Sequence, residues 1–236
     1  SVTAANEHDF AIARLVVTGT AANFGTNGKR TINTSTTATG NDEARSLAIE
    51  GSGATEKIYV GGFADGTDNQ DFAIVKIPGN GNGNDGSFGT AGIKLQDFRA
   101  GINSDEQLFD LKLQGGNIVA VGRFSEIGTP NVDFAVASFN SGTGALGILP
   151  NGDGLTSFYT FRQDGAAALS IQADGNWVVS GSTGYALPGF EGTETNFALA
   201  RYISTTGALD PTFADDGLVT TDFSSLSGST DTAAAT

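Results

Sequence analysis

Four copies of one short motif divide this chain into nearly equal lengths. The motif DFAIARL begins at Asp9, and its later forms DFAIVKI, DFAVASF and NFALARY begin at Asp71, Asp133 and Asn196. The starting points lie 62, 62 and 63 residues apart. A fixed period of this length is the sequence signature of a repeat architecture. The chain is therefore predicted to build its fold from similar units in tandem.

Each complete repeat contains four short apolar segments separated by turn-forming residues. In residues 71–132 these segments read DFAIVKI, IKLQDF, LFDLKLQ and IVAVGRF. Short segments of this kind, bounded by Gly, Asn and Asp, are typical of β-strands. RTI, SLAIE and KIYVGGF supply the later strands of the first repeat, and LTSFYTF, ALSIQ and NWVVSGS supply those of the third. Each copy of the opening motif is therefore expected to be the first of four antiparallel strands.

Four antiparallel strands in each repeat favour a β-propeller. The predicted fold class is all-β: a β-propeller of four-stranded antiparallel blades, with about 62 residues per repeat and an incomplete last repeat. The predicted boundaries are an N-terminal segment 1–8, repeats 9–70, 71–132 and 133–195, and a partial repeat 196–236, all in a single propeller-type domain. The equivalent residues Phe10, Phe72, Phe134 and Phe197 are expected to fill one layer between neighbouring blades.

A glycine recurs at one place in the fourth predicted strand of each complete repeat. Gly62, Gly122 and Gly181 each follow the first apolar residue of that strand by four positions. Glycine inside a strand marks a β-bulge or a place where another backbone approaches closely. One of these two features is therefore expected at all three positions.

The charge balance and the residue usage exclude several classes of partner and site. The chain has 12 basic and 26 acidic side chains, a net charge of −14 and a sequence pI of about 4.2. Such a surface repels phosphate backbones, so no nucleic-acid partner is expected, and it attracts divalent cations. The absence of cysteine excludes disulfides, thiolate zinc sites and cysteine nucleophiles. No apolar run reaches the roughly 18 residues of a membrane span, so membrane insertion is not expected.

The first residues and the composition bear on location. The chain begins at Ser1 and shows no signal-type apolar segment, so we interpret it as a processed protein or a fragment of a longer one. A surface that is acidic, rich in Thr, Ser, Asn and Gly, and poor in Lys suits a bacterial exoprotein. An extracellular or cell-surface location is therefore expected.

Two segments carry a resemblance to a known family. FALARYISTTGALDPTFADDGLVTTDF (residues 197–223) and ALSIQADGNWVVSG (residues 168–181) resemble the delta-sixty repeat family of bacterial tandem repeats. The resemblance covers nearly the whole chain, and it is specific because motif and period agree. It implies a β-propeller-type repeat of large secreted or surface proteins, with no established activity. The third repeat departs from the family pattern with GILPNGDG, and the first departs with TAANFGTNG.

The fourth repeat is incomplete. After NFALARY and LVTTDF the chain ends in STDTAAAT, where a third strand is expected to begin. An incomplete blade leaves open strand edges, which proteins normally cover. A longer parent chain, closure by the N-terminal segment, or completion by another copy in a head-to-tail polymer would each cover them. A longer parent protein or an assembly is favoured over a closed monomer.

The loop PGNGNGNDGSFG, residues 78–89, is the candidate metal site. Asn80, Asn82, Asn84 and Asp85 offer oxygen ligands at alternating spacing, as calcium loops do. The loop lacks the glycine and the final glutamate of an EF-hand, and the alternative is a flexible Gly/Asn turn. Similar oxygen clusters include Asp65, Asp68, Asp71, Asp153, Asp215 and Asp216. Weakly bound Ca²⁺ is the cofactor that this pattern suggests, and none is required for the function predicted below.

An acid recurs just before the third predicted strand of each repeat. The four residues are Asp42, Asp105, Asp164 and Asp231. One acid per repeat at one topological place is what a structural turn or cap requires. The alternative is that these carboxylates ring the central channel of a propeller.

The segment STGYALPGFEGTET, residues 182–195, has no counterpart in the other repeats. It contains Tyr185, Leu187 and Phe190 in what is expected to be an exposed loop. Exposed apolar groups often mark contacts, so these three residues are the candidate interface. The alternative is a loop that folds back on its own blade.

Catalytic chemistry finds little support in the sequence. His8 is the only histidine, which argues against a Ser-His-Asp triad and a multi-histidine metal site. The first hypothesis is a non-enzymatic extracellular repeat protein that acts as a structural, adhesive or self-assembling, filament-forming module. Its expected partners are other copies of itself or surface glycans. The alternative is a glycan-binding or glycan-cleaving propeller with carboxylates in its channel, and a third hypothesis is a monomeric ligand-binding propeller with calcium in its loops.

Overall fold

The regular secondary structure of the described residues is almost entirely β-strand. The computed structural model describes residues 8–16, 18–19, 22–36, 40–66, 69–158, 163–186, 193–223 and 231. The strands among them are β1 (Phe10–Ala13), β2 (Lys29–Ile32), β3 (Asp42–Glu50), β4 (Lys57–Asp65), β5 (Gln70–Pro78), β6 (Ile93–Gln96), β7 (Ser104–Gln114), β8 (Asn117–Glu126), β9 (Val132–Asn140), β10 (Leu155–Thr156), β11 (Gln163–Ile171), β12 (Trp177–Ala186), β13 (Thr193–Tyr202) and β14 (Leu218–Thr221). The only helical segments in these ranges are two 3₁₀ turns, η1 (Gly53–Thr55) and η2 (Pro150–Gly152). No helix in the described part of the chain is long and apolar enough to cross a membrane.

The strands form three sheets. β1 and β2 form a two-stranded sheet, which we call the half-sheet, and β3–β4–β5–β6 form a four-stranded antiparallel sheet. The eight remaining strands form one mixed sheet, in which β7–β8–β9–β10 and β11–β12–β13–β14 are each antiparallel. These two groups meet at a single parallel pair, Gln163 with Val132. We refer to β3–β6, β7–β10 and β11–β14 as the first, second and third units.

The units take their strands from neighbouring sequence repeats. The motif DFAIVKI lies in β5, the third strand of the first unit, and DFAVASF lies in β9, the third strand of the second. The expectation that each motif is the first strand of its sheet is therefore wrong. A period fixes the spacing between equivalent strands, but it does not say after which strand one sheet ends and the next begins. The segments expected as strands nevertheless all contain one.

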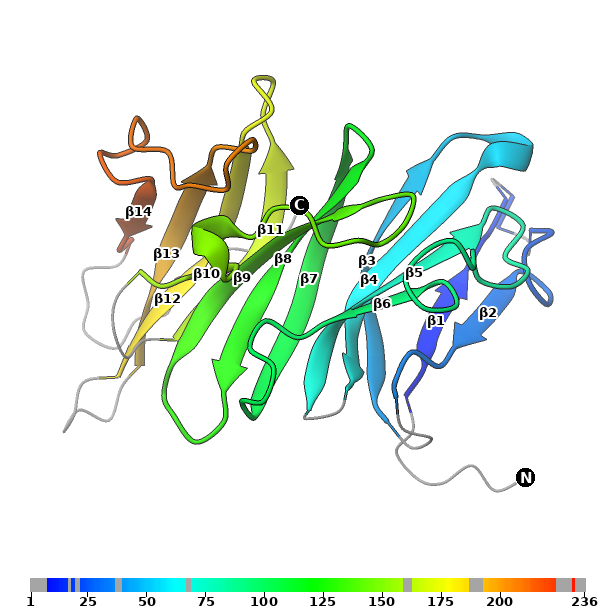
Figure 1. The fold of residues 1–236 in the computed structure, drawn as a ribbon, viewed down its shortest axis with the longest axis horizontal. Helices are drawn as coiled ribbons and strands as arrows, with labels where there is room; N and C mark the ends of the chain where they lie inside the picture. Colours follow the sequence, from blue (N-terminus) through cyan, green and yellow to red (C-terminus); the bar gives the residue numbers. More distant parts are fainter. Residues whose placement is uncertain are drawn as a thin grey trace.

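The half-sheet corresponds to the last two strands of a unit. Phe10 pairs with Ile32 across β1 and β2, as Phe72 pairs with Gln96 across β5 and β6. The half-sheet and the three units stand in a row along the molecule, in chain order (Figure 1). Within the described residues this row does not close into a ring.

Three apolar clusters fill the spaces between neighbours in the row. One joins the half-sheet to the first unit, one joins the first unit to the second, and one joins the second to the third. Phe10, Phe72 and Phe134 are each 0% exposed and lie in these three clusters, one in each. The prediction that they fill a layer between neighbouring sheets is confirmed. Phe197 is only half-buried, because no further unit among the described residues covers its side of the third unit.

The recurring glycines lie opposite β-bulges. The strand pairing shifts between Ala44 and Ser46, between Leu108 and Asp110, and between Ala166 and Ala168. A Cβ on Gly62, Gly122 or Gly181 would lie 1.8, 1.9 or 2.0 Å from a backbone carbonyl oxygen of the bulged strand. The predicted bulge and the predicted close backbone approach are both confirmed.

Candidate interaction surface

The contact between the first and second units defines how neighbouring units fit. Gly61 of β4 leaves space for two leucines of β7, because a Cβ there would lie 2.4 Å from Leu111 Cδ2 and 2.9 Å from Leu108 Cδ2. Both leucines are 0% exposed. The contact between the second and third units repeats this arrangement, with Val121 and Leu169 in one cluster. The first hairpin of each unit therefore covers the first strand of the next.

A side chain beside each of the first two bulges links one unit to the next. Ser46 Oγ accepts a hydrogen bond from Leu111 N at 3.2 Å, and Asp110 Oδ2 accepts one from Leu169 N at 3.0 Å. Asp110 Oδ1 also accepts bonds from Ser46 Oγ at 2.9 Å and from Lys112 Nζ at 3.1 Å. A bulge leaves a backbone group without its ladder partner, so these side chains replace part of the missing pairing.

Asp110 is a residue that sequence reasoning missed. It is 7% exposed, and its equivalents in the other units are Ser46 and Ala168. An acid that occurs in one repeat only, beside the recurring glycine position, is the signal that would have singled it out. Its carboxylate makes contact with the first strands of all three units, which is a positioning role.

Each unit has an acid at the predicted place before its bulge, but in the second unit this acid is Glu106 and not Asp105. Counted from the bulge, Glu106 occupies in β7 the place that Asp42 occupies in β3 and Asp164 in β11, so the expected Asp105 is wrong. The Asp42 carboxylate accepts bonds from the N–H groups of Thr34 and Ser35 at 2.5 and 2.9 Å. Phe158 N donates to Asp164 at 2.8 Å, and Phe223 N donates to Asp231 at 2.7 Å. These carboxylates cap the end of the preceding sheet, as the turn-or-cap interpretation predicts.

Glu106 differs from the other acids of this set in its environment. It is 1% exposed, its Oε1 accepts a bond from Ser104 Oγ at 2.8 Å, and its Oε2 has no hydrogen-bond partner within the described residues. Burial, with a smaller contribution from the charges of Asp97, Asp71 and Asp105, raises the pKa of this carboxyl to about 8, although the bond from Ser104 opposes the rise. Glu106 is therefore protonated at neutral pH, since the fold disfavours its charged form. Asp105, its half-buried neighbour in sequence, accepts a bond from Gln70 N at 3.3 Å instead.

The N-terminal end of the row has an uncovered apolar face. One edge of β1 pairs with β2, and no strand of the described part of the chain pairs with its other edge. Leu47 and Ile49 of β3 are 56% and 52% exposed. Their equivalents in the second unit, Leu111 and Leu113, lie in the core between the first and second units. The same face is therefore buried wherever a unit precedes it.

The C-terminal end of the row has a matching open face. Val119 and Val136 of the second unit are 0% exposed, because the third unit covers them. Their equivalents in the third unit, Val178 and Leu199, are only half-buried. Phe223 is 72% exposed and packs edge to face on Phe197 at 6.0 Å. A hollow of about 580 Å³ lies against β7, β11 and β12, and it is lined in part by Asp110, Lys112, Val178 and Ser180.

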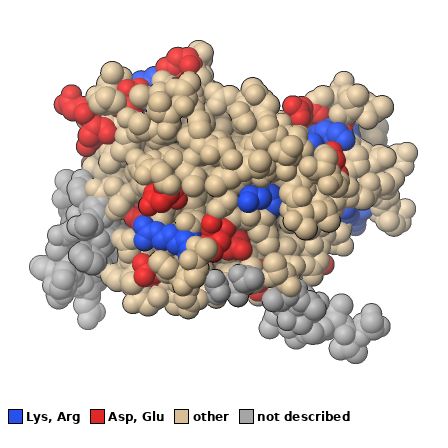
Figure 2. Space-filling view, viewed as in Figure 1, with Lys and Arg blue, Asp and Glu red and all other residues tan. Residues whose placement is uncertain are grey.

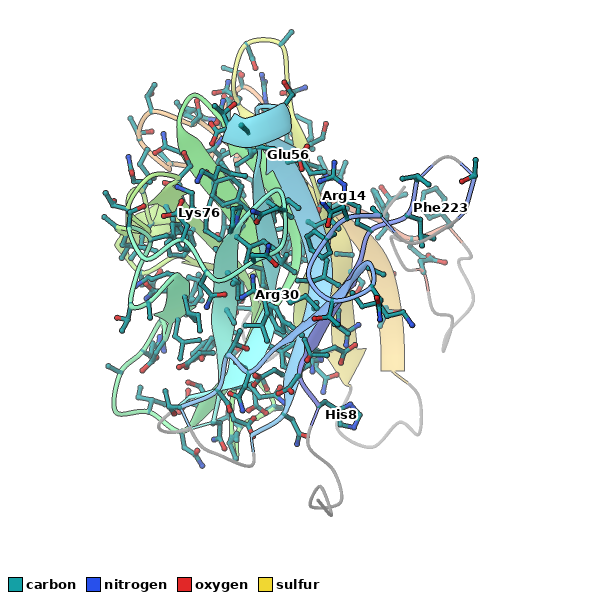
Figure 3. All side chains as sticks on the ribbon, turned by 90° about the vertical axis from the view of Figure 1, so that its right-hand side faces the viewer. His8, Arg14, Arg30, Glu56, Lys76 and Phe223 are labelled. Carbon is teal, nitrogen blue, oxygen red and sulfur yellow. The ribbon has the colours of Figure 1, made fainter. Side chains whose placement is uncertain are left out.

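An ion pair and a hydrogen bond from Arg14 fasten the half-sheet at the rim of the first unit. Arg14 donates to Glu56 Oε1 at 2.5 Å and to the carbonyl of Gly79 at 2.8 Å. Figure 3 shows Arg14 and Glu56 close together beside the half-sheet, with Phe223 set apart from them. Lys and Arg lie in small groups near acidic side chains on the face in Figure 2, most of which carries no charge. The net charge is therefore not concentrated in one continuous acidic patch on that face.

The predicted calcium ligands have partners within the protein. Asp85 Oδ2 lies 3.1 Å from Lys57 Nζ and 3.4 Å from Lys76 Nζ, and Asp85 Oδ1 accepts a bond from Ser87 Oγ at 2.7 Å. The bond from Ser87 and the two lysines hold the pKa of Asp85 far below its usual value. Asn84 accepts a bond from Arg30. The remaining two ligands form a turn of their own, in which Asn82 N donates to Asn80 Oδ1 at 2.9 Å.

Asp85 has an equivalent that makes the same contacts. Asp210 Oδ1 accepts a bond from Thr212 Oγ1 at 2.7 Å, and Asp210 Oδ2 lies 3.0 Å from Arg201 Nη1. Arg201 and Lys76 occupy equivalent places in β13 and β5. The acid of this loop is thus a repeated element that pairs with a cation of the third strand. No group of three His, Cys, Asp or Glu side chains suited to a metal lies within the described ranges.

Calcium binding at this loop stays a prediction, and these contacts set its expected strength. Calcium would have to displace Lys57 and Lys76 from Asp85, so we expect binding only at millimolar calcium. Titration calorimetry on protein freed of metal is expected to give a small heat that Asp85→Asn abolishes. If the parent chain gives no heat, the prediction of calcium binding is wrong. If parent and variant give equal heats, the ion binds at another place.

The predicted interface residues fall largely outside the described residues. The backbone of Tyr185 lies in β12, opposite Glu194 of β13. Leu187 and Phe190 lie outside the part of the chain that the structure describes. Trp177, by contrast, belongs to the core: it is 2% exposed and its Nε1 donates to Gln114 Oε1 at 2.6 Å.

Comparisons with known proteins give no family assignment. No protein-family model matches the chain, and no curated protein matches it significantly. The resemblance to delta-sixty repeats therefore rests on the motifs and the period quoted above.

Proposed function

We propose that this chain is a non-enzymatic, extracellular repeat module that adds like units at its two open faces. The module is of the β-propeller type and of the delta-sixty kind, and it serves a structural or adhesive role through self-assembly into filaments. Other copies of itself are the expected partners, and surface glycans are the expected target of adhesion.

Three features support a propeller-like arrangement of the units. The three units have the same strand order, and each packs its face on the next through an apolar cluster. Their first strands β3, β7 and β11 lie together, linked through Ser46 and Asp110. Each unit would then be one blade, with its first strand nearest the propeller axis.

The exposure of Leu47 is the observation that carries self-assembly. This side chain is 56% exposed, whereas its equivalents Leu111 and Leu169 are 0% and 5% exposed. Repeat proteins need polar capping units at their ends to stay monomeric and soluble. Here both ends present apolar positions that the same fold buries between units, and a heterologous contact between such ends generates chains of molecules.

Glycan cleavage by channel carboxylates remains the alternative hypothesis. The acids with raised pKa values include Glu106 and Asp42, each 1% exposed, so a glycan would not reach either of them. No observation on the described residues favours this alternative. Turnover of any glycan in a broad substrate screen would support it.

The assembly state of the chain tests the proposed function. We expect light scattering and negative-stain electron microscopy to show filaments or long oligomers. Leu47→Asp, on the N-terminal face, and Leu199→Asp, on the C-terminal face, are each expected to abolish long assemblies, because a buried carboxylate would oppose the contact. A mixture of the two variants retains one intact face of each kind and is expected to form dimers.

A matched control separates the end faces from exposed apolar residues in general. Ile127 is 46% exposed and lies in the connection between β8 and β9 of the second unit. Ile127→Asp is expected to leave assembly unchanged. A monomeric parent chain, or a loss of assembly in the Ile127 variant equal to that in the Leu47 variant, would contradict the proposal.

A further inference from the structure

Within the described residues, two strand places beside β1 are unoccupied in the half-sheet, and we call these two places the notch. In each unit the third strand pairs with the second strand on one side and the fourth on the other. β1 holds the place of a third strand and β2 that of a fourth. Within the described residues, no strand fills the first and second places of this sheet. In the three units those places are filled by the hairpins β3–β4, β7–β8 and β11–β12.

Each of the first two hairpins seats the leucine that follows the bulge of the next unit. The hairpin β3–β4 covers Leu111, against which Gly61 fits closely, and the hairpin β7–β8 covers Leu169. Leu47 is the equivalent leucine of β3, and it faces the notch. A hairpin seated in the notch would cover Leu47 in the same way.

The same two hairpins also provide a hydrogen-bond acceptor. Ser46 of β3 accepts the N–H of Leu111, and Asp110 of β7 accepts the N–H of Leu169. The corresponding donor at the notch is the N–H of Leu47. The third hairpin has Ala168 at this place and offers no side-chain acceptor.

We propose that the notch binds a two-stranded β-hairpin of this same repeat type, with serine or aspartate beside its bulge to accept the Leu47 N–H. The inference rests on the proposed function, because it states what a unit added to the N-terminal face must supply. The hairpin supplies a main-chain ladder to the free edge of β1, apolar cover for Leu47 and Ile49, and one directed hydrogen bond. The hairpin β7–β8 has all three of these properties, since Asp110 supplies the acceptor. The hairpin β11–β12 has Ala168 at that place and lacks the acceptor.

A chimera of the full chain tests this inference. Residues 104–132 precede the motif at Asp133 as residues 1–8 precede the motif at Asp9, so the chimera carries residues 104–132 in place of residues 1–8. We expect the amide of Leu47 to exchange with deuterium about tenfold more slowly than in the parent chain, since it becomes hydrogen-bonded. We also expect the thermal midpoint to rise by a few degrees.

Two variants of the added hairpin separate the hydrogen bond from the apolar cover. Asp110→Ala in the added copy is expected to keep most of the rise in midpoint but to lose the protection of the Leu47 amide. Val121→Asp in the added copy places a carboxylate against Leu47 and is expected to lose both effects. Equal exchange of the Leu47 amide in the parent chain and the chimera would overturn the inference.

The outcome is independent of the test of the proposed function. The chimera reports on the notch within one molecule, whereas light scattering of the unchanged chain reports on assembly. If the Leu47 amide of the chimera is protected from exchange but the parent chain is monomeric, the inference about the notch is kept and self-assembly is removed. If the parent chain forms filaments but the Leu47 amide of the chimera exchanges as fast as in the parent chain, self-assembly is kept and the inference about the notch is overturned.

Discussion

Gly122→Ala is expected to destabilise the folded chain by about 3 kcal/mol, the upper range for inserting a methyl group into a packed site. The alanine Cβ would lie 1.9 Å from the carbonyl oxygen of Gln107 and 2.9 Å from the Cα of Leu108. Both atoms belong to the backbone of the bulged strand β7, so no side-chain rotation relieves the collision. Urea denaturation of parent and variant, followed by tryptophan fluorescence, measures the loss.

Gly165→Ala is the matched control for this substitution. Gly165 also lies in a strand next to a bulge, in β11, but a Cβ there would meet no atom within 4 Å. We expect its free energy of unfolding to stay within about 0.5 kcal/mol of the parent value, as for most substitutions in open space. Equal losses in the two variants would show that the bulge contact is not the cause.

Glu106→Gln is expected to stabilise the chain at pH 8 by about 4 kcal/mol and to have little effect near pH 4.5. The pKa of Glu106 is about 8 in the fold, against an ordinary value of 4.5 that applies to the unfolded chain. Between these values the unfolded chain releases its proton while the folded chain retains it. The contribution of Glu106 is therefore complete below pH 4.5, falls as the pH rises, and levels off above pH 8. Glutamine stays neutral throughout and avoids this loss.

The difference in free energy of unfolding between the parent chain and the Glu106→Gln variant separates the effect of Glu106 from the effects of other titrating groups. Burial also raises the pKa values of Asp42 and Asp133, so both chains share a background decrease in stability with rising pH. The measurement is the free energy of unfolding of parent and Glu106→Gln at several values between pH 4.5 and 9. A difference that does not change over this range would contradict the buried, protonated state.

The repeat in the sequence predicted the local structure well. DFAIVKI and IVAVGRF lie in β5 and β8, because alternating apolar residues bounded by turn formers bury one or both faces of a strand. Gly122 stood out because glycine is disfavoured in strands unless a contact requires it. Such features depend only on the properties of a strand and its neighbours in sequence.

Other features depend on which strands meet in space. Asp105 and Glu106 are adjacent in sequence, and only the register of β7 against β8, set by the bulge, decides which of them is buried. Asp110 forms its contacts with Ser46 and with Leu169, which are 64 and 59 residues away. No local pattern distinguishes these partners from other residues of the same type.

The sequence by itself determined that this protein is an all-β repeat chain with antiparallel strands at a constant period, because periodicity and turn chemistry are local properties. The tertiary structure decided where each sheet begins, which acid is buried without its charge, and which apolar side chains are left uncovered at the two ends. These outcomes follow from packing between units, since the burial of a side chain such as Leu47 depends on a neighbour that its own strand does not specify.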